Sequence, residues 1–184
     1  MGEKSIDLVK KALPEIANIK DKLLREAVIQ IWLEVWQESV WDSLYDAPKN
    51  PVDAGKDDRL IDHTNSVTLG CIEFAKTIKE VYGILVDMDH LRVISLLHDV
   101  SKLLEYDKNG QTDFGRLIQH GVYGAFKAWE KALPSEVIHS IISHTKKSAV
   151  IPSTLEGIIL HYIDFADSDV LQYRAGKKLF LDGH

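Results

Sequence analysis

Residues 96–102 (LLHDVSK) place a histidine and an aspartate, His98 and Asp99, side by side within an apolar stretch. Burying two ionisable side chains without partners costs several kcal/mol. A metal ion offsets this cost, because imidazole and carboxylate groups are both metal ligands. If the stretch is helical, Lys102 lies on the same flank as the pair, because it follows them by four and three residues. The alternative for the pair alone is a hydrogen-bonded core histidine beside an exposed aspartate.

Further histidines and aspartates occur at helix-like positions in the rest of the chain. The candidate metal ligands are His63, His98, Asp99, His120, His144 and Asp164. Each lies on a different expected helix, or near its end, with apolar residues behind it. Facing helices of a bundle build metal sites in this way. Four imidazoles and two carboxylates exceed the needs of one tetrahedral ion, and they suit two ions that share Asp99.

Apolar residues at i, i+3 and i+4 spacing predict a succession of helices. These helices are expected over residues 5–18, 20–43, 60–82, 87–99, 117–133, 135–145 and 155–170. Pro14 should kink or end the first helix, and Gly83 should end the helix that begins at residue 60. Neither an internal repeat nor an alternating strand pattern is present in the sequence. The predicted fold class is therefore all-α.

The chain has 184 residues, which suffice for one domain with a sizeable core. We predict an N-terminal helical extension over 1–46, a loop or linker over 47–59, a main domain over 60–174 and a tail over 175–184. Trp32 and Trp36 form a stripe on the extension, at a spacing that favours core packing. Contact with a partner or stacking on a base is the alternative. The extension is also a candidate for capping a pocket or for a homodimer contact.

The composition is that of an ordinary globular protein, with 45% hydrophobic and 27% charged residues. A net charge of −6 and a pI near 5.7 disfavour nucleic acid and anionic membranes as partners. The single Cys71 excludes an internal disulfide bond and fits a reducing cytoplasm. The sequence has neither the layout of a signal peptide nor an apolar run long enough to span a bilayer. We therefore expect a cytoplasmic protein.

The order His…His-Asp…His…His…Asp resembles that of the HD-domain superfamily of metal-dependent phosphohydrolases, in its longer, two-metal pattern. Residues 97–102 (LHDVSK) look like the signature helix of that superfamily. Residues 160–164 (LHYID) are similar to its last ligand helix. The likeness covers about residues 60–170 and implies an HD-domain helical bundle. Its motif is specific for the superfamily and unspecific for substrate.

The resemblance also implies how the ligands divide between two ions. The first ion would be held by His63, His98, Asp99 and Asp164, and the second by Asp99, His120 and His144. Members with a single metal lack the two middle histidines, so their presence here favours two ions. His161, one turn before Asp164, is an alternative ligand, but we expect it to support the site or to face solvent.

Two positive residues are candidates for substrate binding. Lys102 could neutralise a phosphate oxygen or assist the leaving group, and its alternative is a solvated helix lysine. If residues 116–120 are helical, Arg116 shares a face with His120 and could grip phosphate in the same pocket.

Other polar residues near the expected ligands have weaker assignments. Lys146 and Lys147 form either a basic rim or a solvated turn. Asp167 either orients a ligand histidine or lies on an exposed face. We expect no metal role for His90 or His139.

Four imidazoles match iron, manganese, zinc, cobalt or nickel better than magnesium. Two such ions, about 3.5–4 Å apart, activate a shared water and clamp phosphate oxygens. We therefore expect a phosphoric ester hydrolase that uses metal-bound hydroxide, with Asp99 and Lys102 as catalytic residues. Its substrate would be a phosphate mono- or diester of a nucleotide or similar small molecule, for example a pterin or nucleotide cyclic phosphate.

Two alternatives use the same ligands or the same fold. A di-iron oxygenase of the myo-inositol-oxygenase type has this ligand order, and it would need iron and consume oxygen. A non-catalytic binding module is disfavoured, because it has no need for six buried polar groups.

Overall fold

The computed structural model describes residues 4–50 and 58–183. The elements run in the order α1 (Ile6–Ala12), η1 (Pro14–Asn18), α2 (Lys22–Glu38), η2 (Leu44–Asp46), α3 (Leu60–Tyr82), α4 (Met88–Leu97), α5 (Lys102–Glu105), β1 (Tyr106–Asp107), β2 (Gly110–Gln111), α6 (Asp113–Leu117), α7 (Val122–Glu130), α8 (Ser135–Ser143), α9 (Leu155–Arg174) and η3 (Phe180–Gly183). The all-α prediction is confirmed. The antiparallel pair of β1 and β2 is a short hairpin whose turn residues are Lys108 and Asn109.

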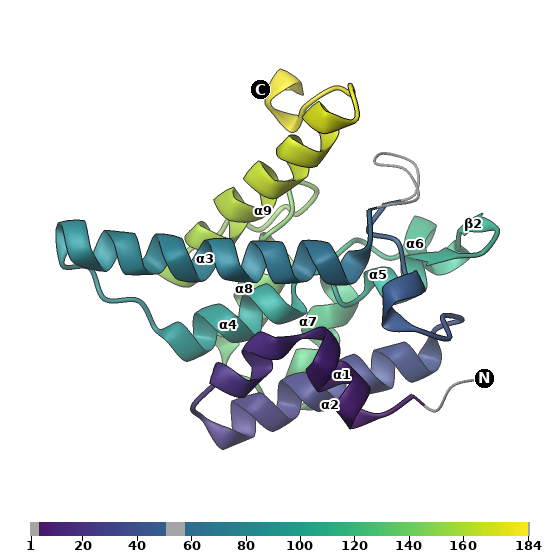
Figure 1. Cartoon of the computed structure of the whole chain (residues 1–184), viewed down its shortest axis with the longest axis horizontal. Coiled ribbons are helices and arrows are strands. Elements are labelled where there is room, and N and C mark those ends of the chain that lie inside the picture. Colours follow the sequence, from purple (N-terminus) through teal and green to yellow (C-terminus); the bar gives the residue numbers. More distant parts are fainter. Residues whose placement is uncertain (1–3, 51–57, 184) are drawn as a thin grey trace.

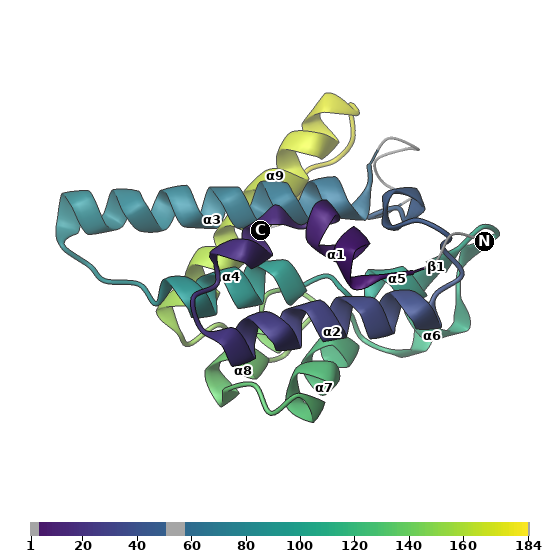
Figure 2. The same ribbon diagram turned by 60° about the horizontal axis from the view of Figure 1, so that its bottom comes forward.

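Helix α4 lies at the centre of the bundle and contacts α2, α3, α8 and α9 (Figures 1 and 2). Its apolar residues point in several directions. Every residue from Leu91 to Leu97 is buried except Arg92. A helix that is apolar around most of its circumference is stable only when other helices surround it. The His98-Asp99 pair follows this helix directly, so the fold delivers the pair to the interior.

The two helix ends that the sequence marks most clearly are present. The side chain of Asp87 accepts hydrogen bonds from the backbone N–H groups of Asp89 and His90 at the start of α4. Gly83 ends α3 in the left-handed region, at φ 70°. Helix α3 has the predicted bounds, and it extends along one side of the molecule in Figure 1.

The N-terminal elements α1, η1 and α2 share one hydrophobic core with α3 and α4. Trp32 is 0% exposed, and its indole N–H donates to the carbonyl of Leu96 at 2.8 Å. The indole of Trp36 donates to the carbonyl of Trp41 at 2.9 Å. The prediction that the tryptophan stripe is core is therefore confirmed. We propose that residues 4–46 are an integral layer of the fold, while the predicted domain division stays a prediction.

Two expected helices differ from the structure. The helix predicted over 20–43 ends at Glu38. There, the Lys4 ammonium donates hydrogen bonds to the backbone carbonyls of Trp36 and Ser39, at 2.6 and 2.9 Å. The helix predicted over 117–133 begins only at Val122, as α7, and residues 118–121 lie outside any helix, with Gly121 at φ 85°. A Cβ at Gly121 would lie 2.8 Å from the carbonyl oxygen of Ile141, so the break requires glycine.

Part of the predicted linker, residues 51–57, and the last residue of the predicted tail lie outside the described residues. Within the described parts of the chain, every helix is too short or too polar to cross a membrane.

Candidate metal centre

The six predicted ligands come from five parts of the fold and meet in the interior. His63 lies in the first turn of α3, and His98 and Asp99 follow α4. His120 lies in the turn before α7, His144 follows α8, and Asp164 lies in the middle of α9. Four of the six follow or precede a helix, which lets side chains from neighbouring helices converge.

The first group forms around the imidazole of His63. Its Nε2 atom lies 3.1 Å from Asp164 Oδ1, 3.2 Å from Asp99 Oδ2 and 3.3 Å from His98 Nε2. His98 Nε2 lies 3.5 Å from the same Asp99 oxygen. Potential ligand atoms of His63, His98 and Asp99 are thus close enough to bind one cation.

The second group forms around the other carboxylate oxygen of Asp99. Asp99 Oδ1 lies 2.5 Å from His120 Nε2 and 3.5 Å from His144 Nε2. The two imidazole nitrogens are 3.1 Å apart. Because one oxygen of Asp99 faces each group, this carboxylate is placed to bridge two cations.

The outer nitrogen of every imidazole is held by an acceptor. His63 Nδ1 donates to Asp167 Oδ2 at 2.6 Å, and His120 Nδ1 donates to Glu105 Oε1 at 2.9 Å. His98 and His144 Nδ1 donate to backbone carbonyls three residues earlier, both at 2.7 Å. A proton fixed on Nδ1 leaves the Nε2 lone pair of a neutral imidazole pointing at the centre. This is the tautomer that a metal ligand needs.

The spacing of these atoms fits bound cations. Ligand atoms that surround one transition metal at about 2.0–2.2 Å lie roughly 3.0–3.5 Å from one another. The two imidazole pairs, at 3.3 and 3.1 Å, match this spacing. Without a proton or a cation between them, such nitrogens would face each other with lone pairs. In addition, Asp99 Oδ1 is buried without a well-aligned hydrogen bond, although His120 Nε2 is near.

The pKa values of these groups show how strongly the site favours positive charge. Burial lowers the pKa of His63, but hydrogen bonds to Asp164, Asp167 and Asp99 outweigh it and raise the value to about 10. Burial also opposes the charged form of His120, whereas Asp99 above all raises its pKa to about 9. His98 has no comparable hydrogen bond to a carboxylate, and its burial lowers its pKa to about 4. Without metal, protons on His63 and His120 stand in for the cations.

The carboxyl groups of Asp99 and Asp164 stay ionised. Burial favours the neutral form of Asp99, but Lys102, His98 and His120 hold its pKa well below the usual range. The hydrogen bond to His63 likewise outweighs burial at Asp164 and lowers its pKa. Both groups are therefore available as anionic ligands.

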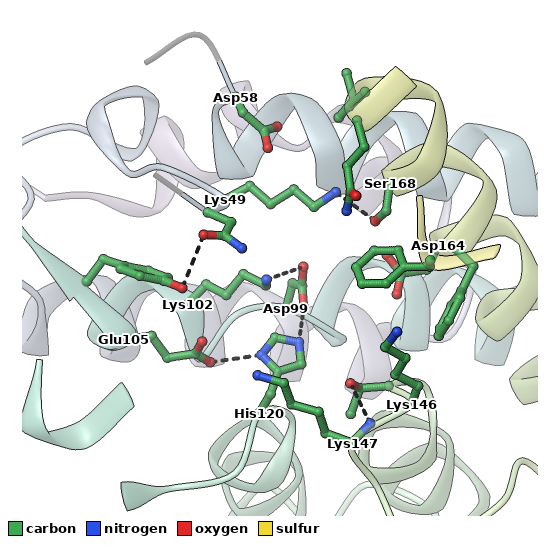
Figure 3. Close-up of a pocket in the computed structure, with 17 residues that line it drawn as sticks. Lys49, Asp58, Asp99, Lys102, Glu105, His120, Lys146, Lys147, Asp164 and Ser168 are labelled. Carbon is green, nitrogen blue, oxygen red and sulfur yellow. Dashed lines mark hydrogen bonds and ion pairs between the residues drawn. The ribbon is translucent and has the colours of Figure 1, made fainter. Parts of the chain in front are cut away.

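A cavity of about 170 Å³ opens onto the cluster, and Figure 3 shows the side chains around it. Asp99, His120 and Asp164 form the part of its wall that belongs to the cluster. Its lysines are Lys49, Lys102, Lys146 and Lys147, and its large apolar side chains include Tyr106, Phe165, Leu171 and Phe180. The rings of Phe165 and Phe180 are 5.5 Å apart. The cavity thus combines a cationic part with an aromatic wall.

Lys102 lines this cavity as its functional interpretation required, and Lys146 and Lys147 line it as the first of their two interpretations proposed. Lys102 Nζ lies 3.6 Å from Asp99 Oδ2, although residues 98–101 form turns in place of a continuous helix. Asp99 raises the pKa of Lys102 against the effect of burial. Asp167 holds His63 from outside the ligand group, as the first of its two interpretations proposed.

The structure corrects the premise behind Arg116. Helix α6 ends at Leu117 and His120 follows in a turn, so Arg116 and His120 do not share a helical face. Arg116 is exposed, pairs with Asp113 and is not among the residues that line the cavity.

The remaining histidines that the structure describes lie outside the ligand groups. His161 Nδ1 donates to the backbone carbonyl of His144 at 2.6 Å, so it supports the chain beside a ligand. His139 accepts a hydrogen bond from the backbone of Ser153, and His90 lies near Asp87 at the start of α4.

Several residues of the cavity were not predicted from the sequence. Glu105 holds His120, and its pKa is lowered by that hydrogen bond despite burial. Asp58 is buried at the rim, and burial raises its pKa. Lys49 donates to Ser168 Oγ at 2.8 Å across the cavity entrance. No local spacing links these positions to the His-Asp pair, so sequence patterns carried no signal for them.

The protein is an all-α bundle with a buried cluster of histidines and aspartates that could hold divalent metal. These features place it among the helical metal-binding proteins. A model of the HD domain matches residues 61–168, so the chain belongs to the HD domain family, and the resemblance seen in the sequence is confirmed.

A curated protein of Methanocaldococcus jannaschii, "Dihydroneopterin 2',3'-cyclic phosphate phosphodiesterase", is 29% identical over 164 residues. The alignment covers 83% of this chain and 66% of that protein, so it extends beyond the family model and leaves about a third of the relative unmatched. No solved structure gives a significant match to the chain.

Proposed function

We propose that this protein is a metal-dependent phosphohydrolase that cleaves a phosphate mono- or diester of a small molecule. One observation carries the proposal: four imidazole Nε2 atoms, each fixed by an acceptor at Nδ1, converge on the two oxygens of Asp99 beside an open cavity. The family match and the name of the Methanocaldococcus relative support the same reaction class.

The ligand set fits two divalent transition-metal ions. His63, His98, Asp99 and Asp164 would hold one ion, and Asp99, His120 and His144 the other. Because four of the six proposed ligands are imidazoles, the set favours iron, manganese, zinc, cobalt or nickel over magnesium. When bound, such ions supply an activated water and neutralise charge that develops on phosphate oxygens.

The chain's own residues would orient the substrate. Lys102 reaches into the cavity beside Asp99, where its ammonium can contact a phosphate oxygen and stabilise growing negative charge. Asp167 and Glu105 keep His63 and His120 in the required tautomer. We assign catalytic roles to Asp99 and Lys102, and we assign none to Arg116.

We propose that the substrate is a small molecule that contains a flat ring and carries a phosphate group. The cavity is small, and the Phe165 and Phe180 side chains give it an aromatic wall. Since the name of the relative specifies a cyclic phosphate diester, a small cyclic phosphodiester is the specific candidate. We propose no dimer through Trp32 and Trp36, because both side chains are buried within the chain.

The test is hydrolysis under anaerobic conditions. Chelator-treated protein is reloaded with manganese, iron, cobalt, nickel or zinc and assayed with the monoester 4-nitrophenyl phosphate, with bis(4-nitrophenyl) phosphate and with a nucleoside 2′,3′-cyclic phosphate. We expect turnover of at least one ester with at least one metal and its loss in Asp99→Ala. Metal-loaded protein that cleaves none of the three esters would refute the proposal. Oxygen consumption with iron would instead favour the oxygenase alternative, which the comparisons do not support.

A further inference from the structure

Lys49 is a buried cation that lacks an anionic partner among the described residues. The residue is 7% exposed and lies between η2 and the start of α3. Its ammonium donates to the neutral hydroxyl of Ser168 at 2.8 Å, whereas no described carboxylate forms an ion pair with it. An ammonium has three N–H donors, and a buried charge without an anion is costly.

The position of Lys49 shows what its free donors face. Lys49 lines the same cavity as Lys102 and Asp99, and Figure 3 shows its side chain reaching across the cavity towards Ser168 on α9. Its charge is close enough to affect the pKa values of His63 and Asp167. The ammonium therefore lies on the side of the cavity next to the first ligand group.

The charges around the cavity favour an anion there. Four lysines line it, whereas three of its four carboxylates, those of Asp99, Glu105 and Asp164, are engaged by the histidine cluster. Among the described lining residues, this leaves only the buried carboxyl of Asp58 outside the cluster. Asp58 does not form an ion pair with Lys49, although the two charges interact. A site lined in this way attracts phosphate more strongly than a neutral ligand.

We propose that Lys49, held in place by Ser168, binds the phosphate group of the substrate opposite Lys102. The inference rests on the proposed function and adds a specificity residue to it from outside the residues matched by the family model. The two ammonium groups would grip an anionic phosphoester from two sides, and the neutral Ser168 hydroxyl would orient Lys49 without neutralising it.

The experiment compares metal-loaded wild type with Lys49→Met, Lys49→Arg and, as a matched control, Lys108→Met. Lys108 is exposed and pairs with Asp42 away from the cavity. Affinity for inorganic phosphate is measured by calorimetry, and KM is measured with bis(4-nitrophenyl) phosphate at equal metal content. Lys49→Met should weaken phosphate binding by about 10- to 100-fold, the range for charge-assisted hydrogen bonds, and should raise KM. Lys49→Arg should retain most of the affinity, and Lys108→Met should match wild type.

A melting temperature separates this role from a structural one. Because Lys49 has no anionic partner in the described structure, Lys49→Met should melt no lower than wild type. Equal phosphate affinity in Lys49→Met and wild type overturns the inference, and so does a lower melting temperature with unchanged KM. Metal-loaded wild type that binds phosphate in a Lys49-dependent way but cleaves neither phosphate monoesters nor diesters refutes only the proposed function.

Discussion

Asp167 offers a direct test of how the first ligand group is held, because it contacts the metal site only through His63. Its Oδ2 atom accepts the Nδ1 proton of His63 at 2.6 Å, and the side chains of Asp167 and His63 are 15% and 0% exposed. Asp167→Ala leaves the Nδ1–H group buried without its acceptor and frees the ring to turn. Loss of such an outer partner lowers metal affinity by about 10- to 100-fold, or about 1.4–2.7 kcal/mol.

The assay is competition for zinc between the protein and a chromogenic chelator. Asp167→Ala should weaken one of two binding events by this amount, and Asp167→Asn should weaken it less, because the amide oxygen still accepts the proton. Asp62→Ala is the control, since Asp62 is half-exposed and pairs with Arg59 close to His63. If Asp167→Ala binds both ions as tightly as wild type, His63 is not a ligand held by Asp167.

Three further outcomes follow from the same geometry. Glu105→Ala should lower the affinity for the second metal ion by about 10- to 100-fold, because it frees the ring of His120. Unchanged metal affinity would argue against this role of Glu105. Trp32→Ala should lower the unfolding free energy by about 3–5 kcal/mol, measured by urea denaturation, since it removes a buried indole and its bond to the Leu96 carbonyl. The metal-free protein should lose stability as pH rises from about 6.5 towards 9, because His63 and His120, with pKa values raised to about 10 and about 9, hold protons that the unfolded chain releases. Each proton changes the free energy of unfolding by up to about 1.4 kcal/mol per pH unit. A melting temperature that rises over this pH range, measured in the presence of a chelator, would contradict the assignment.

The elements that sequence patterns predicted well are those fixed by local chemistry. Helix α3 has a long apolar stripe and ends at Gly83, and its bounds match the prediction. The position of Lys102 beside Asp99 also followed from helical spacing, although turns rather than a continuous helix provide it. In both cases, the signal lies within a few residues of the structure it specifies.

The elements that could not be predicted depend on distant contacts. The break before α7 arises because Gly121 packs against the carbonyl of Ile141, and the end of α6 at Leu117, where Ile118 adopts extended backbone, separates Arg116 from His120. Asp167, the partner of His63, is 104 residues away from it in the sequence, and Lys49 meets Ser168 119 residues away. Such contacts exist only after the helices pack, so a single sequence carries no periodic signal for them.

If Asp99 joins two metal ions in one cluster, the amount of metal that the protein binds depends on this one carboxylate. Mass spectrometric metal analysis should find about two transition-metal ions per wild-type chain after loading and dialysis, in line with a two-metal site. Asp99→Ala should retain few or no metal ions, while its circular dichroism spectrum shows the same helical content as wild type. Asp99→Ala that keeps the wild-type metal content, or wild type that binds no divalent metal, would contradict the account.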